Sequence, residues 1–267
     1  MTLVMGILNV TPDSFSDGGS YLDPALAVAH ARRMVADGAD LIDVGGESTR
    51  PGAERVPVGE ELSRVLPVVR ALAAEGAKVS IDTMRAEVAE RAVEAGAVLI
   101  NDVSGGLADP DLLSVAAEWR VDLCLMHWRG HSAHMQDAAV YDDVVSDVAD
   151  ELLARRDAAL AAGVAEDRII LDPGIGFAKT WDHNWELLGQ LERFVGLGHR
   201  VIVGASRKAF LGGLLDGRPP AGRDAATAAL TLWSALHGVW AVRTHEVRMQ
   251  ADAIAVASRL TVPDTAG

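Results

Sequence analysis

Cysteine and long apolar runs are what this chain has least of. Cys124 is the only cysteine in 267 residues, so the sequence offers neither a disulfide framework nor a cysteine-based metal cluster. No apolar stretch approaches the ~20 residues that span a bilayer, and residues 1–6 lack the basic and apolar segments of a secretion signal. These absences predict a soluble, cytoplasmic protein with no membrane partner.

Positive charge is also scarce. The chain carries 24 Lys and Arg against 38 Asp and Glu, which gives a formal net charge of −14. A field of that sign repels nucleic acid and acidic membrane surfaces, so nucleic acid is not an expected partner. An anionic ligand would have to be held by a local cluster of basic side chains.

Apolar segments are short and numerous. Hydrophobic residues make up 49% of the chain, and no linker or low-complexity tract divides it, which predicts one domain over residues 1–267. Short runs of aliphatic residues without polar alternation are typical of strands buried on both faces of a parallel sheet. Eight such runs occur: Leu3–Val10, Asp40–Val44, Lys78–Ile81, Val98–Asn101, Val121–Met126, Arg168–Leu171, His199–Val203 and Val239–Val242.

Segments with helical periodicity separate the predicted strands. Examples are Pro24–Ala36, Glu60–Ala74, Arg85–Ala95, Asp142–Ala162 and Arg223–His237. Eight strand–helix repeats in a chain of this length match an α/β fold of the (β/α)₈ or TIM-barrel class, which typically has ~250 residues. A doubly wound open sheet more often has about five or six strands and a glycine-rich first turn, so we predict the barrel.

Polar residues end or follow every predicted strand. Barrel enzymes place their catalytic groups at the C-terminal ends of the strands. Asp82, Asn101 and Asp172 occupy such positions on the third, fourth and sixth strands, and their side chains would suit a flat heterocycle such as an aminopyrimidinone. The alternative is that the carboxylates cap helices or pair with lysine, which explains Asn101 poorly because Asp102 could supply that cap.

Basic residues gather after the last two predicted strands. Lys208, Arg243 and His245 lie in the quarter of a barrel where phosphate groups are often held. Each residue alone is explained by a surface ion pair or a half-buried imidazole. Together at one rim, the three favour an anion site.

The candidate metal ligands include an amide oxygen and three histidines. Asn9, at the start of a loop of small and polar residues typical of a mobile lid, could bind hydrated Mg²⁺, which often uses only one or two protein oxygens together with substrate phosphate. His127, His131 and His134 have the spacing of zinc ligands on one helical face, but Gly130 interrupts that helix. We therefore favour Mg²⁺ over zinc.

Seven ordered segments, taken together, resemble the dihydropteroate synthase family of the folate pathway over nearly the whole chain. They are residues 9–19 (NVTPDSFSDGG), 43–52 (DVGGESTRPG), 80–83 (SIDT), 101–106 (NDVSGG), 172–180 (DPGIGFAKT), 204–208 (GASRK) and 243–247 (RTHEV). The resemblance implies a homodimeric barrel and a transferase of an alkyl group. It implies Mg²⁺-assisted condensation of 6-hydroxymethyl-7,8-dihydropterin diphosphate with 4-aminobenzoate to 7,8-dihydropteroate, with sulfonamides as competitors.

The resemblance also implies a role for each matching residue. Asp82, Asn101, Asp172 and Lys208 would grip the pterin, with Phe177 lining its pocket; Asn9, Arg243 and His245 would hold the diphosphate and metal; Phe15, Asp17, Thr49, Arg50 and Pro51 would close over 4-aminobenzoate. We expect Asp17, Lys208, Arg243 and His245 to be the catalytic residues. Neutralised diphosphate can leave first, after which a neutral arylamine suffices as nucleophile if water is excluded.

Two alternatives remain open. Pterin-binding methyltransferases use the same kind of barrel and similar Asp and Asn contacts, but they would not need the basic cluster after the last two strands. A paralogue that binds pterin without catalysis would be expected to lose loop residues such as Asp17 and Arg50, which are present here. Ala209 is a small departure from the family pattern, since many relatives carry a polar residue there.

Overall fold

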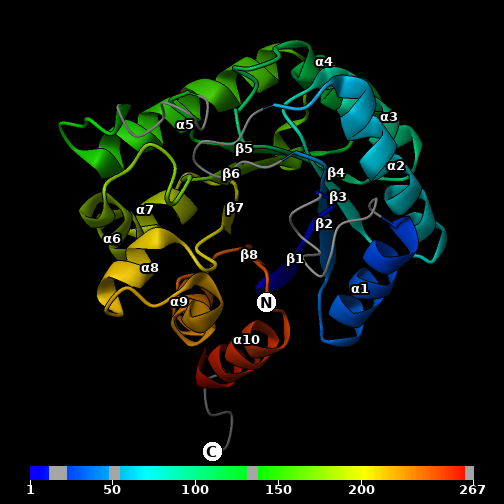
Figure 1. Cartoon of the computed structure of the whole chain (residues 1–267). Helices are drawn as coiled ribbons and strands as arrows, with labels where there is room; N and C mark the ends of the chain where they lie inside the picture. The colour runs from blue at the N-terminus through cyan, green and yellow to red at the C-terminus, as the bar shows by residue number, and fades with distance from the viewer. Residues whose placement is uncertain (12–22, 48–54, 131–137, 262–267) are drawn as a thin grey trace, which may run out of the picture.

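Eight parallel strands form a closed barrel inside a ring of helices (Figure 1). The computed structural model describes residues 1–11, 23–47, 55–130 and 138–261. The strands are β1 Leu3–Asn9, β2 Leu41–Gly45, β3 Val79–Asp82, β4 Leu99–Asp102, β5 Asp122–Met126, β6 Ile169–Asp172, β7 Arg200–Val203 and β8 Ala241–Thr244. Pairing of β1 with β8, in which Val4 lies opposite Val242, closes the barrel. The predicted (β/α)₈ fold is confirmed.

The helices follow the strands in the order that the sequence pattern predicts. They are α1 Pro24–Ala36, α2 Val58–Ala74, α3 Ala86–Glu94, α4 Asp111–Trp119, α5 Val144–Ala161, α6 Trp181–Gly189, α7 Leu191–Val195, α8 Ala209–Leu214, α9 Asp224–Leu236 and α10 Arg248–Thr261. Short 3₁₀ turns at Glu166–Arg168 and Pro220–Arg223 precede β6 and α9. Among these described helices, none combines the length and apolar character needed to cross a membrane.

Local sequence explains where the first helix begins and which face it buries. Asp23 accepts a hydrogen bond from the backbone of Ala25 at 2.9 Å, and Pro24 occupies the first turn, where a missing N–H costs nothing. Ala27, Ala31 and Met34 recur at helical spacing and are buried. The helix therefore packs one apolar stripe onto the barrel.

The apolar core has an outer and an inner part. The larger part lies between the strands and the helices, and the inner part fills the barrel with side chains that include Met5, Leu99, Cys124 and Ile170. Cys124 is fully buried there, and burial raises the pKa of its thiol. The barrel interior is thus packed, and polar chemistry is left to its C-terminal rim.

Candidate functional site

Polar side chains from four strands meet at the C-terminal rim of the barrel. Arg243 on β8 donates from Nε to Oδ2 of Asp43 on β2, and from Nη2 to Oδ2 of Asp82 on β3, each at 2.6 Å. Asn101 on β4 donates from Nδ2 to the same oxygen of Asp43 at 3.0 Å. Asp43, Asp82 and Asn101 are buried. The guanidinium therefore connects the predicted anion site with two residues of the predicted heterocycle site.

Asp43 is a site residue that we did not predict. It is fully buried, and its Oδ2 accepts from both Arg243 and Asn101, while Oδ1 has no hydrogen-bond partner among the described residues. A carboxylate in the middle of an apolar strand requires a cationic partner to be tolerated. The position of Asp43 within the apolar strand Leu41–Gly45 therefore indicates a buried ion pair. The strand pattern does not indicate which basic residue is its partner.

Asp102, the neighbour of Asn101, is engaged locally. Its Oδ1 accepts from Ser104 N at 2.8 Å and Ser104 Oγ at 2.7 Å, and its Oδ2 accepts from Gly106 N at 2.5 Å. Burial raises the pKa of Asp102 to about 6, although these hydrogen bonds lower it. Asp102 thus orders the β4–α4 loop, and Asn101 supplies the amide group at the rim.

Burial and neighbouring charges set the pKa values around Arg243. Burial raises the pKa of Asp82 to about 7; Arg243 lowers it and Asp43 raises it. Burial alone would lower the pKa of Arg243, but Asp43 and Asp82 together raise it above its usual range. Arg243 is therefore a permanent cation at this rim.

A second group of predicted residues meets at the ends of β6 and β7. Lys208 donates from Nζ to the carbonyl oxygen of Ile175, and Nζ lies 4.3 Å from the centre of the Phe177 ring. Asp172 Oδ1 accepts from Gly174 N at 2.7 Å, which folds the β6–α6 loop back over the strand end. The structure thus places Lys208, which follows β7, against Phe177 and Ile175 of the loop that begins at Asp172.

Gly176 makes room for the Lys208 side chain. Its φ is +82°, a left-handed conformation that favours glycine, and a Cβ there would lie 2.7 Å from Lys208 Cδ. Burial lowers the pKa of Lys208 to about 7, although Asp172 raises it. Burial also raises the pKa of Asp172. These two groups therefore titrate closer to neutral pH than exposed side chains do.

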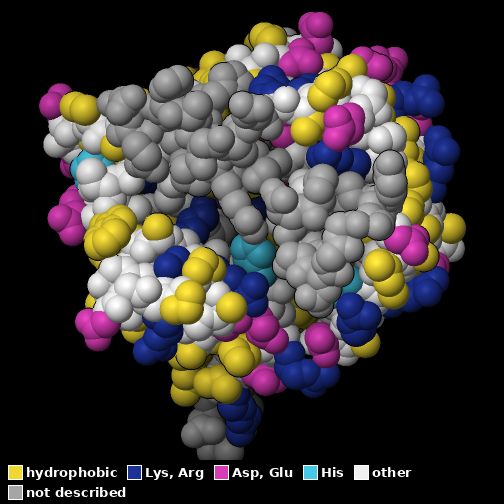
Figure 2. Space-filling view, viewed as in Figure 1, with side chains coloured by type: hydrophobic (Ala, Val, Ile, Leu, Met, Phe, Trp, Pro, Cys, Tyr) yellow, Lys and Arg dark blue, Asp and Glu magenta, His cyan; other side chains and the backbone are white. Residues whose placement is uncertain are grey.

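His245 is oriented by a serine at the end of β7. Its Nδ1 lies 3.0 Å from Ser206 Oγ, and its backbone N donates to the same hydroxyl oxygen at 3.1 Å. Ser206 is buried and lies within the 204–208 segment, but the sequence does not indicate a role for it. On the face viewed in Figure 2, basic side chains (dark blue) and histidine (cyan) gather beside a central depression.

The chain is similar to proteins of one family over nearly its whole length. The family model described as pterin binding enzyme matches residues 5–245. Dihydropteroate synthase of Mycobacterium leprae is 54% identical over 259 residues, covering 95% of this chain and 91% of the relative, and that of Bacillus subtilis is 49% identical over 248 residues, covering 92% and 84%. The chain belongs to the dihydropteroate synthase family. The predicted resemblance is confirmed, and with it the predicted transferase class.

Solved structures of the synthase family have the same fold. Xanthomonas albilineans dihydropteroate synthase with 4-aminobenzoic acid has a TM-score of 0.92 and 45% identity, covering 98% of this chain and 94% of that one. The same enzyme in complex with 7,8-dihydropteroate has a TM-score of 0.89 and 42% identity, covering 98% and 95%. The Yersinia pestis synthase in a sulfonamide complex has a TM-score of 0.92 and 42% identity, covering 97% and 94%.

Of the remaining predicted site residues, the structure describes Asn9 and leaves five outside the described ranges. Asn9 ends β1 opposite Gly45 of β2, and a Cβ on Gly45 would lie 3.7 Å from Asn9 Oδ1 and 3.5 Å from Asp82 Oδ2, so the Asn9 amide and the Asp82 carboxylate flank the same glycine. Five predicted residues lie outside the described ranges, namely Phe15, Asp17, Thr49, Arg50 and Pro51. Among the described residues, no group of three or more His, Cys, Asp and Glu side chains is placed to hold a metal ion.

The histidines of the zinc alternative have other surroundings. His127 is buried directly after β5, with Nε2 2.9 Å from Glu151 Oε2 and Nδ1 3.0 Å from Lys179 Nζ. Both ring nitrogens therefore face protein partners. His131 and His134 lie outside the described ranges.

Apolar side chains line the rim next to Asp82 and Asn101. Met84, Val103 and Met126, which follow or end β3, β4 and β5, form a small buried cluster, against which Trp128 and Phe177 pack. Because the cluster borders carboxylate and amide groups, the combination suits a flat ring with a polar edge. We predicted Phe177 as a wall residue, but not the methionines.

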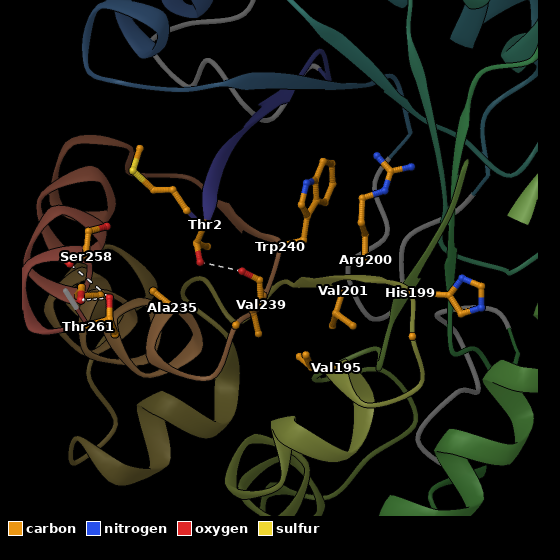
Figure 3. A pocket seen from close by; sticks show the side chains of 14 residues that line it. Thr2, Val195, His199, Arg200, Val201, Ala235, Val239, Trp240, Ser258 and Thr261 are labelled. Carbon is orange, nitrogen blue, oxygen red and sulfur yellow. Dashed lines mark hydrogen bonds between the residues drawn. The ribbon is translucent and has the colours of Figure 1, made fainter. Parts of the chain in front are cut away.

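A cavity of about 590 Å³ lies away from these residues, at the N-terminal end of the barrel (Figure 3). It is lined by Thr2, His199, Arg200, Trp240 and Ser258 among others, and Thr2 is bonded to the carbonyl of Val239 at 2.7 Å. No predicted site residue lines it. Since barrel enzymes carry their active sites at the opposite end, we place the candidate site at the C-terminal rim.

Proposed function

We propose that this chain condenses 6-hydroxymethyl-7,8-dihydropterin diphosphate with 4-aminobenzoate to give 7,8-dihydropteroate and diphosphate. The observation that carries the proposal is the linked rim of Arg243, Asp43, Asp82 and Asn101, because it joins a permanent cation to the donors and acceptors that a pterin edge needs. Relatives solved with 4-aminobenzoic acid and with 7,8-dihydropteroate support it.

The pterin ring would lie between the two groups of rim residues. Asp82, Asn101 and Asp172 would bind its polar edge, and Phe177 with the Met84 cluster would contact its faces. Lys208, which already lies against the Phe177 ring, would donate a hydrogen bond to the pterin. A carboxylate with a raised pKa can bind the pterin edge as donor or acceptor, as its protonation allows.

The diphosphate would lie toward β1 and β8. Arg243 and His245 would neutralise its oxygens, as charge-assisted hydrogen bonds to phosphate do. Asn9 fits Mg²⁺ because its donor is an amide oxygen beside the Asp82 carboxylate at the rim, and Mg²⁺ prefers oxygen ligands. When bound, Mg²⁺ would help to neutralise the charge that grows on the departing diphosphate.

Bond breaking would precede bond making. The C–O bond to diphosphate breaks with both electrons leaving on the diphosphate, and the pterin ring delocalises the positive charge left on the methylene carbon. The amine nitrogen of 4-aminobenzoate then forms the C–N bond and releases a proton. Positioning and water exclusion supply most of the remaining rate enhancement, which is why the chain needs no covalent nucleophile.

The loop residues complete the proposal. Phe15, Asp17, Thr49, Arg50 and Pro51 would hold 4-aminobenzoate, with Asp17 and the residues Lys208, Arg243 and His245 acting as catalytic groups. We further propose that the chain works as a single-domain homodimer in the cytoplasm, with small molecules rather than nucleic acid or membrane as its ligands.

The test is a direct assay. Purified protein is mixed with Mg²⁺, the pterin diphosphate and 4-aminobenzoate, and dihydropteroate and diphosphate are measured by chromatography and a coupled phosphate assay. We expect equal amounts of both products and competition by a sulfonamide against 4-aminobenzoate. Mixtures without 4-aminobenzoate or without Mg²⁺ are the controls. A folded protein that forms no dihydropteroate would overturn the proposal.

A further inference from the structure

A buried lysine outside the predicted site connects three elements of the barrel. Lys179 follows Phe177 by two residues on the β6–α6 loop and is 3% exposed. Its Nζ lies 3.0 Å from Nδ1 of His127, after β5, and donates to the carbonyl of Phe177 at 3.0 Å. His127 in turn contacts Glu151 on α5. The proposed mechanism gives these residues no role.

The hydrogen bonds of this network have one direction. Burial lowers the pKa of His127 to about 4, so the ring is neutral near pH 7. An ammonium has only donors, so Lys179 donates to Nδ1, and the remaining ring proton on Nε2 is donated to Glu151. The hydrogen bond from His127, followed by those from Arg129 at 3.1 and 3.2 Å, lowers the pKa of Glu151 to about 2, which keeps it an acceptor.

The network holds the backbone of the β6–α6 loop from both sides. Lys179 fixes the Phe177 carbonyl, and Tyr141 Oη donates to the Ala178 carbonyl at 2.9 Å, at a residue whose φ is +49°. Gly174 on the same loop packs so closely on the His127 carbonyl that a Cβ would not fit. The loop therefore packs directly on His127, the residue that accepts a hydrogen bond from Lys179.

This loop carries the contacts of the proposed pterin pocket. The Phe177 ring lies 4.3 Å from Lys208 Nζ, and Lys208 donates to the carbonyl of Ile175 in the same loop. A shift of the backbone at Phe177 would therefore move both the aromatic wall and the lysine above it. Lys179 itself bonds to His127 and to the Phe177 carbonyl, and the charge of Lys208 lowers its pKa.

Charged groups face Lys179 from every neighbouring element. Burial lowers its pKa to about 7; Lys208 after β7 and Arg129 after β5 lower it as well, whereas Asp172 on β6 and Glu151 on α5 raise it. An uncharged Lys179 could still bond to the Phe177 carbonyl, but more weakly. The hydrogen bond that holds the loop at Phe177 is thus strongest when Lys179 is protonated.

We propose that Lys179, supported by His127 and Glu151, is a positioning residue that sets the place of Phe177 and Lys208 for pterin binding. The inference rests on the proposed function for the identity of the ligand. It concerns binding of the pterin and leaves the 4-aminobenzoate side of the reaction unaffected.

The decisive variant is Lys179→Met, which keeps an apolar stem and removes the ammonium. We expect the Kd for the pterin diphosphate, measured by titration calorimetry with Mg²⁺, to rise about 10-fold, while the KM for 4-aminobenzoate at saturating pterin stays within about twofold. Lys78→Met is the matched control, because the chain has three lysines and Lys78 is exposed on the loop before β3. It should change neither constant.

Two further measurements separate positioning from charge and from folding. Titration with the uncharged 6-hydroxymethylpterin should show the same loss for Lys179→Met, since a purely electrostatic role would weaken only the diphosphate-bearing ligand. Glu151→Gln, at a partly exposed position, should weaken pterin binding in the same selective way by about threefold. These bindings can be measured even if no dihydropteroate is formed, so a failure of the proposed reaction stays distinguishable.

The inference is overturned if folded Lys179→Met binds both pterins as the wild type does. It is also overturned if the loss is confined to the diphosphate-bearing ligand, or if the KM for 4-aminobenzoate rises as much as the pterin Kd. Thermal unfolding of each variant reports whether the fold is intact, and if Lys179→Met does not fold, Glu151→Gln decides by the same criteria.

Discussion

The two halves of the barrel rim hold positive charge in different ways. On the side of β2, β3 and β8, Arg243 bonds directly to the carboxylates of Asp43 and Asp82. On the side of β5, β6 and β7, Lys208 and Lys179 donate to backbone carbonyls of one loop. Their pKa values fall to about 7 through burial, whereas that of Arg243 rises.

The difference suits two tasks. A guanidinium held by two carboxylates keeps its charge and geometry at any ordinary pH, which is what a departing diphosphate requires. Buried ammonium groups without a bonded carboxylate cost less to neutralise, and their charge responds to the ligand. We therefore infer that the Arg243 half provides constant electrostatic stabilisation and that the Lys208 half adjusts to the bound pterin.

The largest effect should come from removing the permanent cation. Arg243→Ala leaves Asp43 and Asp82 without their partner and the diphosphate without its neutralising charge, so kcat/KM should fall by about 10³-fold. Arg243→Lys keeps the charge but cannot bridge both carboxylates, so it should recover only part of the loss. Steady-state kinetics measures both, and a fully active Lys variant would remove the distinction between the two halves.

A smaller loss should follow from the opposite half. Lys208→Ala should lower kcat/KM by about 10²-fold, mainly through a higher KM for the pterin diphosphate, because the hydrogen bond and the contact with Phe177 are lost. The KM for 4-aminobenzoate should change little. Equal changes in both Michaelis constants would show that Lys208 acts on more than the pterin.

Gly176→Ala tests how closely Lys208 is fitted to its loop. The new Cβ would meet Lys208 Cδ, and the backbone there is left-handed, so the lysine must shift and the KM for the pterin should rise about 10-fold. Gly76→Ala is the matched control, since its φ is also +82° and its Cβ would have nothing within 4 Å. Comparable losses in both variants would contradict the fit.

The smallest effect is a pH dependence. As pH rises through about 7, Lys208 in the free protein loses its proton, so pterin diphosphate binding should weaken several-fold between about pH 7 and 8.5. Asp82, whose pKa is also about 7, ionises over the same range. Lys208→Ala keeps the titration of Asp82, so the difference between wild-type and variant slopes isolates Lys208. Identical slopes would assign the dependence to Asp82 or to Lys179, whose pKa is also about 7.

The sequence pattern predicts the barrel well because each strand corresponds to a short apolar run in the local sequence. Every predicted apolar run overlaps an observed strand, and the disagreements lie at the ends: the last run was predicted at Val239–Val242, whereas β8 spans Ala241–Thr244. Pairing with β1 starts at Ala241 opposite Leu3 and carries the strand on through Arg243, although polar Arg243 and Thr244 end the apolar pattern. Tertiary pairing thus overrides local composition.

The site is harder to predict because its bonds are long-range. Residue types alone suggested Asp82, Asn101, Asp172 and the basic cluster, since strand ends in a barrel converge on one rim. They could not pair Arg243 with Asp43, which lies 200 residues away. The role of Lys179 could not be predicted for a different reason. A lysine in a glycine-rich motif gives no indication in the sequence that it is buried against a histidine of another loop.

The 200-residue span between Asp43 and Arg243 also bears on when the chain becomes useful during synthesis. During synthesis β2, β3 and β4, whose carboxylates the finished barrel buries, are made early, and Arg243 is made only with the eighth strand. A nascent chain that stops before that strand lacks both the pairing that closes the barrel and the cation that compensates Asp43. Ligand binding and completion of the fold therefore depend on the same late stretch of translation.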